Sequence, residues 1–153
     1  MDKIRDNSST ALVEALNGAL ADTLALYIKS KNFHWHVSGP RFRDLHLLFD
    51  EHAQQLLGTV DLIGERVRKN GAVTHTSLGS IARQTAIADQ DGAMIEPQAM
   101  IEELRDDNRK LHDRLRQVKE AADAANDNAT SGIVDDWTDQ CEQRIWFLSM
   151  AAK

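Results

Sequence analysis

The sequence predicts an all-α protein, a four-helix bundle with a short extra helix between the second and third long helices. Four long segments repeat apolar residues at three- and four-residue steps, which is typical of amphipathic helices. Only two prolines occur in 153 residues, and no stretch alternates apolar and polar residues as a strand does. This length suits a single domain over residues 1–153, with a flexible N-terminus over residues 1–8.

The first predicted helix begins near Ser9 or Thr10, because either side chain is a good N-cap. It runs towards Val37 and ends at residues 38–40, a Ser-Gly-Pro sequence that breaks helices. Its apolar stripe consists of Leu12, Leu16, Leu20, Leu24 and Tyr27. The second predicted helix begins near Phe42 and ends at the Asn-Gly pair of residues 70–71.

The segment 72–95 is mixed, and its middle, SLGSIARQTAI, predicts the short helix. The third long helix opens at Glu96-Pro97, since proline is tolerated in a first turn, and reaches about residue 125. Its charged run at 102–107 is interpreted as a solvated face. The sequence NDNATSG then predicts a turn before a last helix over about 131–151. Four long helices in this order predict a bundle, in which the connection 72–95 can cross from one end to the other.

The composition excludes several classes of protein. The single cysteine, Cys141, excludes an intrachain disulfide and a cysteine zinc cluster. No uninterrupted apolar run reaches the roughly 18 residues of a membrane span, so we expect a cytoplasmic protein without membrane partners. The net charge is −6, and the lysines and arginines are not gathered at the ends. We therefore expect weak or no DNA binding at physiological salt.

The stretch HLLFDEHAQQLLGTVDLIGE places four metal-binding side chains on one face of the second helix. At roughly 100° per residue, His46, Asp50, Asp61 and Glu65 fall within about 100° of one another, away from the apolar stripe. At about 1.5 Å per residue, Asp50 and Asp61 lie roughly 16 Å apart. A metal holds its ligands at about 2–2.5 Å, so one chain cannot bring the two pairs to one ion.

The spacing is, however, symmetric about a point between Gln55 and Leu56. Two copies of this helix, packed antiparallel about a two-fold axis there, would place one copy's His46 and Asp50 opposite the other copy's Glu65 and Asp61. An isologous dimer makes that contact twice. The preceding turn could also bring His34 to the site. Imidazole with carboxylates suits iron, manganese or zinc.

The sequence HWHVSGPRFRDLHLLFDEHAQQLLGTVDLIGER resembles the signature of the Dps family, the mini-ferritins. The resemblance implies a ferritin-like domain whose subunits form a hollow dodecamer from two-fold dimers. It implies a ferroxidase that oxidises Fe(II) with hydrogen peroxide or oxygen, stores Fe(III) mineral and protects against oxidative stress. The implied two-iron site takes His34, His46 and Asp50 from one subunit and Asp61 and Glu65 from its partner. Trp35, beside these ligands, is the candidate electron donor that intercepts radicals.

Three other functions compete with this interpretation. A classical ferritin or di-iron oxygenase builds its site inside one bundle from Glu-x-x-His pairs, and no glutamate here has a histidine three residues later. A DNA-binding, nucleoid-protecting protein with minor iron chemistry would need basic residues that this chain does not gather. A purely structural helical oligomer would leave the polar stripe unexplained.

The family's pore carboxylates would fall near Asp127, Asp135 and Asp136, without assignment to any of them.

Overall fold

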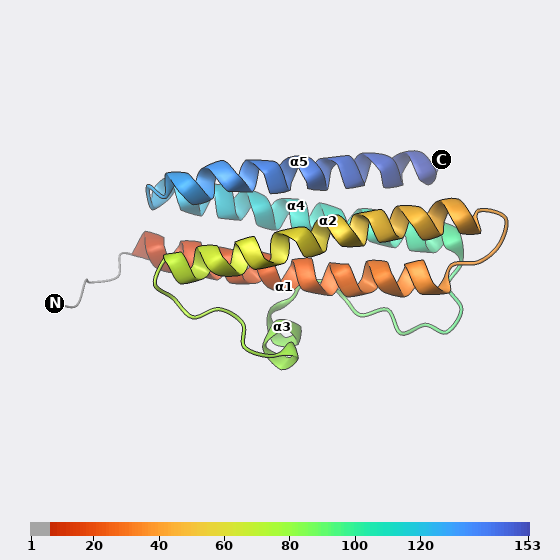
Figure 1. Ribbon diagram of the computed structural model, residues 1–153, viewed down its shortest axis with the longest axis horizontal. Helices are drawn as coiled ribbons and strands as arrows, with labels where there is room; N and C mark the ends of the chain where they lie inside the picture. The colour runs from red at the N-terminus through yellow and green to blue at the C-terminus, as the bar shows by residue number, and fades with distance from the viewer. Residues whose placement is uncertain (1–6) are drawn as a thin grey trace.

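A computed structural model describes residues 7–153 and confirms the predicted all-α class: over this range it contains five helices and no strand. The four long helices form a bundle, and the short one lies in the connection between the second and third of them (Figure 1). The helices are α1 (Asn7–His36), α2 (Phe42–Lys69), α3 (Leu78–Gln84), α4 (Pro97–Ala124) and α5 (Asn128–Ala151).

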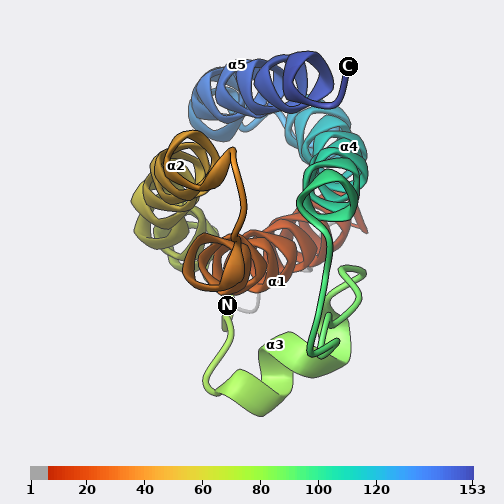
Figure 2. The same ribbon diagram turned by 90° about the vertical axis from the view of Figure 1, so that its right-hand side faces the viewer.

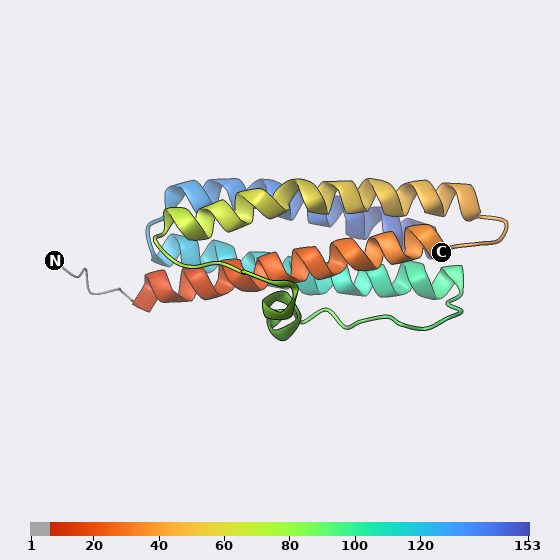
Figure 3. The ribbon, with the colours of Figure 1, turned by 60° about the horizontal axis from the view of Figure 1, so that its bottom comes forward.

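The bundle consists of two antiparallel pairs. α1 packs against α2, and α4 packs against α5, while α1 also contacts α4 along the bundle. Seen from the end, the four helices occupy the corners of a square, with α3 outside it beside α1 (Figure 2). The connection over residues 70–96 runs the length of the bundle, so α2 and α4 point the same way (Figure 3). This is the long crossover that the sequence predicts.

Backbone conformations at two turns explain where the long helices end. Gly39, between α1 and α2, has a φ of 100°, which favours glycine because it lacks a Cβ atom. Asn126, between α4 and α5, has a φ of 56°, a left-handed conformation that asparagine tolerates. The Asp127 side chain then accepts a hydrogen bond from the Thr130 backbone N–H at 3.1 Å and caps α5.

This cap corrects one predicted boundary. α5 begins at Asn128, so NDNATSG is a turn only in its first residues and helix thereafter. α1 also begins earlier than predicted, at Asn7. The predicted flexible segment 1–8 therefore overlaps the helix at its end, and its first six residues lie outside the described residues. α3 ends at Gln84, three residues before the end of the predicted segment SLGSIARQTAI, and the other boundaries agree with the sequence to within a residue or two.

The predicted apolar stripes meet in one core. Leu12, Leu16, Leu45, Phe49, Leu56, Ile63, Ile101, Leu104, Leu111, Leu115, Val118, Val134, Trp137, Cys141 and Leu148 are all at most 2% exposed. Part of α1, Ser9–His36, is long and apolar enough to cross a membrane by length and composition. However, 56% of its most apolar stretch is buried inside the bundle, which identifies it as a core helix.

Several charged side chains are also buried, against expectation for the run 102–107. Asp107 is 3% exposed because Lys29 of α1 reaches it, with Nζ 2.7 Å from Oδ2. The same ammonium lies 2.9 Å from Glu103 and donates to the Ala88 carbonyl of the crossover. In the bundle centre, Arg144 is 2% exposed, and its guanidinium donates to the side-chain oxygens of Asn108 and Gln55.

Candidate metal centre

His34 and His46 lock the end of α1 to the start of α2. Their rings stack with centroids 3.8 Å apart and an interplanar angle of 13°. Nδ1 of His34 lies 2.6 Å from the His46 carbonyl oxygen, and Nδ1 of His46 lies 2.7 Å from the His34 carbonyl oxygen. The turn at Gly39 makes this reciprocal contact possible by reversing the chain within a few residues. The structure therefore brings together two of the predicted ligands.

These contacts define which ring nitrogen of each histidine can bind a metal. A carbonyl oxygen only accepts, so each Nδ1 must carry the proton and donate it. The lone pair of each neutral ring is then on Nε2, which makes no hydrogen bond to any described residue. An imidazole whose Nδ1–H is held by a carbonyl is the usual arrangement of a metal-binding histidine. The pair is thus preorganised to offer two nitrogen ligands.

Asp50 lies one helical turn beyond His46, and its carboxylate has a cationic partner. Lys31 of α1 donates from Nζ to Asp50 Oδ1 at 2.8 Å. This hydrogen bond holds the pKa of Asp50 below its ordinary value of 3.8. Lys31 also lies over the Trp35 ring, 5.8 Å from its centroid. Trp35 itself is 61% exposed, although it is large and apolar.

Lys31 is not among the predicted site residues, although its position in the sequence carries a signal. Lys31 precedes His34 by three residues and Trp35 by four, which places all three on neighbouring positions of one helix face.

Asp61 and Glu65 are exposed on α2 and do not reach the histidines. Asp61 follows Asp50 by eleven residues, or roughly 16 Å along a helix. Neither carboxylate makes a hydrogen bond or ion pair with another described residue. Over residues 7–153, no group of three or more His, Cys, Asp or Glu side chains lies close enough to hold a metal. Within the described chain, the predicted ligands therefore lie in two separate groups, here called half-sites: His34, His46 and Asp50 form one, and Asp61 and Glu65 form the other.

The face of α2 that carries these half-sites also exposes apolar side chains. Leu57 lies at about 20° and Leu47 at about 100° from His46 around the helix, within the range of the predicted ligands. Their exposed fractions are 42% and 45%, and Leu62 near this face is 40% exposed. On the adjacent α1, Ile28 is 58% exposed. Apolar side chains gathered around two half-sites are typical of a protein–protein interface.

Arg66, directly after Glu65, links α2 to the start of α5. Its guanidinium donates to Thr130 Oγ1 at 2.8 Å and to the Asp127 carboxylate at 3.1 Å. Asn70 donates to the same carboxylate. Although burial opposes it, these hydrogen bonds and those from Thr130 hold the pKa of Asp127 well below its usual range.

Among the three candidate pore carboxylates, Asp127 therefore caps α5 and forms an ion pair with Arg66. Asp135 pairs with Lys119 at 2.9 Å, and Asp136 accepts from Gln140 at 3.0 Å.

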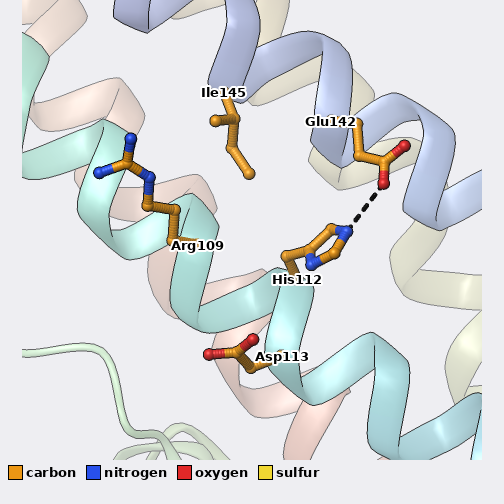
Figure 4. Close-up of a pocket in the computed structure, with 5 residues that line it drawn as sticks. All are labelled: Arg109, His112, Asp113, Glu142 and Ile145. Carbon is orange, nitrogen blue, oxygen red and sulfur yellow. Dashed lines mark hydrogen bonds and ion pairs between the residues drawn. The ribbon is translucent and has the colours of Figure 1, made fainter.

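A separate shallow pocket lies between α4 and α5, lined by Arg109, His112, Asp113, Glu142 and Ile145 (Figure 4). His112 Nε2 lies 2.9 Å from Glu142 Oε2 across it. None of the predicted ligands lines this pocket, because they lie on the α1–α2 pair.

The fold and these half-sites define the class of protein. The ferritin-like domain matches residues 13–152, so the chain belongs to the ferritin-like family. Within it, the chain is a member of the Dps family, as the sequence signature predicts. The DNA protection during starvation protein of Brevibacillus brevis is 31% identical over 133 residues, which span 87% of this chain and 89% of that protein.

Solved structures of Dps proteins are similar to this chain over nearly its whole length. A Dps protein from Bacillus brevis has a TM-score of 0.92 at 27% identity, covering 98% of this chain and 100% of that one. The Dps protein of Vibrio cholerae O1 has a TM-score of 0.89 at 26% identity, covering 96% and 92%. That protein is described as a member of the ferritin-like diiron-carboxylate superfamily.

Proposed function

We propose that this protein is a ferroxidase that oxidises Fe(II) at two-iron sites between subunits and stores Fe(III) mineral in a dodecameric shell. Its oxidant is hydrogen peroxide or oxygen, and its role is protection against oxidative stress. We place this activity in the cytoplasm, where the single free thiol, buried Cys141, needs no disulfide partner. Membership of the Dps family supports the iron chemistry.

The locked histidine pair is the observation that carries the proposal. His34 and His46 each hold Nδ1–H on a backbone carbonyl and leave Nε2 for a metal. His46 lies at one end of a face of α2, with the His34 ring of α1 stacked on it. Further along that face, Asp61 and Glu65 have no hydrogen-bond or ion-pair partner among the described residues. A two-fold axis between Gln55 and Leu56 would bring the two ends together, and the exposed leucines around them would be covered in the same contact.

In such a dimer, Asp61 and Glu65 of one subunit would bind the first Fe(II) together with the partner subunit's His34. His46 and Asp50 would bind the second Fe(II) more weakly. Two Fe(II) ions supply the two electrons that reduce one hydrogen peroxide, with two protons, to two water molecules. This two-electron step avoids release of a hydroxyl radical. Trp35, exposed beside the histidines, would donate an electron to any radical that does form.

The test is iron oxidation by a pair of ligand variants. We expect wild-type protein to have a native mass of about twelve times 17.1 kDa and to oxidise Fe(II) faster with peroxide than in its absence. The Asp61→Asn/Glu65→Gln variant should keep the native mass but oxidise Fe(II) at least about tenfold more slowly, because it lacks the hard oxygen ligands.

A control variant is Asp139→Asn, which removes an exposed carboxylate on α5. It should oxidise Fe(II) at the wild-type rate. A wild-type rate in the Asp61/Glu65 variant would refute the proposed site, and a monomeric native protein would refute the shell.

DNA binding is the alternative function, and the net charge of −6 opposes it. We expect no shift of duplex DNA in a mobility assay at neutral pH and physiological salt. Tight binding that weakens steeply as salt rises would favour the alternative.

A further inference from the structure

The carboxylates of the proposed site are not equivalent before metal binds. Asp50 already holds a cation, because the Lys31 ammonium lies 2.8 Å from its Oδ1. The side chains of Lys31 and Asp50 are 17% and 36% exposed, so this pair is partly shielded from water. Asp61 and Glu65, in contrast, have no hydrogen-bond or ion-pair partner within residues 7–153. Before any metal binds, the negative charge of Asp50 is thus neutralised by Lys31, whereas no described residue neutralises Asp61 and Glu65.

The charges of an assembled site follow from this difference. Each site would combine three carboxylates with one ammonium, which leaves a net charge of −2. One divalent cation balances that charge, and a second would have to enter beside both the first metal and the ammonium. Like charges at a few ångströms repel strongly where water is partly excluded. The second metal can therefore use Asp50 Oδ1 only if Lys31 moves away, and at Oδ2 it would still meet the repulsion of the ammonium.

The structure also offers a place for the displaced ammonium. Lys31 lies 5.8 Å from the centroid of the Trp35 ring, within the range of a cation–π contact. A small rotation of this long side chain would exchange the carboxylate for the ring face without leaving the site. Trp35 is 61% exposed, so the ring is not blocked by its own subunit.

We propose that the Lys31 ammonium competes with the second metal ion for the Asp50 carboxylate in each site. One divalent metal binds tightly at the end of the site that carries Asp61 and Glu65, and the second binds only when Lys31 yields Asp50. This inference rests on the proposed intersubunit site. It assigns to Lys31 a positioning role: the ammonium sets the order and the affinity with which the two metals load.

The test is metal binding without turnover, using Co(II) under anaerobic conditions and measuring bound metal per subunit by equilibrium dialysis and calorimetry. Wild-type protein should bind about one Co(II) per subunit tightly and a second at least about tenfold more weakly. Lys31→Met, which keeps the length of the side chain but removes its charge, should bind the second Co(II) at least about tenfold more tightly than wild type. Lys31→Arg should resemble wild type because it retains the charge.

Lys119→Met is the matched control, since Lys119 pairs with Asp135 at 2.9 Å between α4 and α5, which carry none of the proposed ligands. It should bind both metals as wild type does. Native mass and helical content should be unchanged in all three variants. Unchanged second-metal affinity in Lys31→Met, or equal affinities for both metals in wild type, would overturn the role of Lys31 alone. Wild-type protein that binds no Co(II), or whose binding survives Asp61→Asn/Glu65→Gln, would instead overturn the site itself.

Discussion

Lowering the pH from 7 to 5 should destabilise this bundle through His52, which is 3% exposed on the core side of α2. Its Nδ1 has no hydrogen-bond partner among the described residues. Burial, together with the nearby Arg144 guanidinium, lowers the pKa of His52 from 6.5 to about 3. The folded protein therefore keeps this imidazole neutral over the whole range, while the unfolded chain takes up a proton.

The size of the effect follows from proton linkage. Because the pKa of His52 is lower in the folded state, its contribution is complete above pH 6.5 and is lost as the pH falls towards 3. Each pH unit below 6.5 costs about 1.4 kcal/mol, so the free energy of unfolding should fall by about 2 kcal/mol between pH 7 and pH 5.

The assay is guanidinium unfolding of wild type and His52→Leu at both pH values and at one fixed subunit concentration. The other five histidines are present in both proteins, so their effects cancel in the comparison. The pH-dependent loss of stability should be about 2 kcal/mol smaller in His52→Leu. His112→Gln, a change at the α4–α5 pocket, should leave the contribution of His52 in place. Equal pH dependence in wild type and His52→Leu would show that the core does not hold His52 neutral.

Three further predictions concern the turns and the thiol. Asp127→Ala should lower the free energy of unfolding by about 1–3 kcal/mol at neutral pH, because it removes the N-cap of α5 and the carboxylate partner of Arg66; a loss below 0.5 kcal/mol would contradict this. Gly39→Ala should cost about 1 kcal/mol or more in the same measurement because φ is 100°, whereas Gly132→Ala, in a helix with free space around it, should stabilise slightly. Burial raises the pKa of the Cys141 thiol to about 11, so a thiol reagent should label it only as the protein unfolds, and rapid labelling of native protein would argue against its burial.

Periodicity was sufficient to predict the helices and the two faces of α2, because each face repeats one kind of residue over many turns. It could not predict the burial of Asp107. A run of charged residues does not reveal which member faces another helix, and the partner, Lys29, lies 78 positions earlier in the chain. The predicted start of α5 was wrong for a local reason, because asparagine and aspartate favour both turns and helix caps.

The site was predictable only in part. Four ligand candidates follow from spacing along one helix, but the carbonyl contacts of His34 and His46 depend on the exact path of the turn between them. The role of Lys31 was also not predictable, because a lysine three residues before a histidine is usually an ordinary surface residue.

The buried guanidinium of Arg144 affects where this protomer can hold a metal ion. It gives the hydrophobic interior a permanent positive charge that its neutral partners Asn108 and Gln55 do not cancel. This charge would repel a divalent cation close to Arg144, so that part of the interior is unfavourable for a metal site. In the proposed dimer, the metal ions would instead lie at the surface of each protomer, between side chains of the two copies.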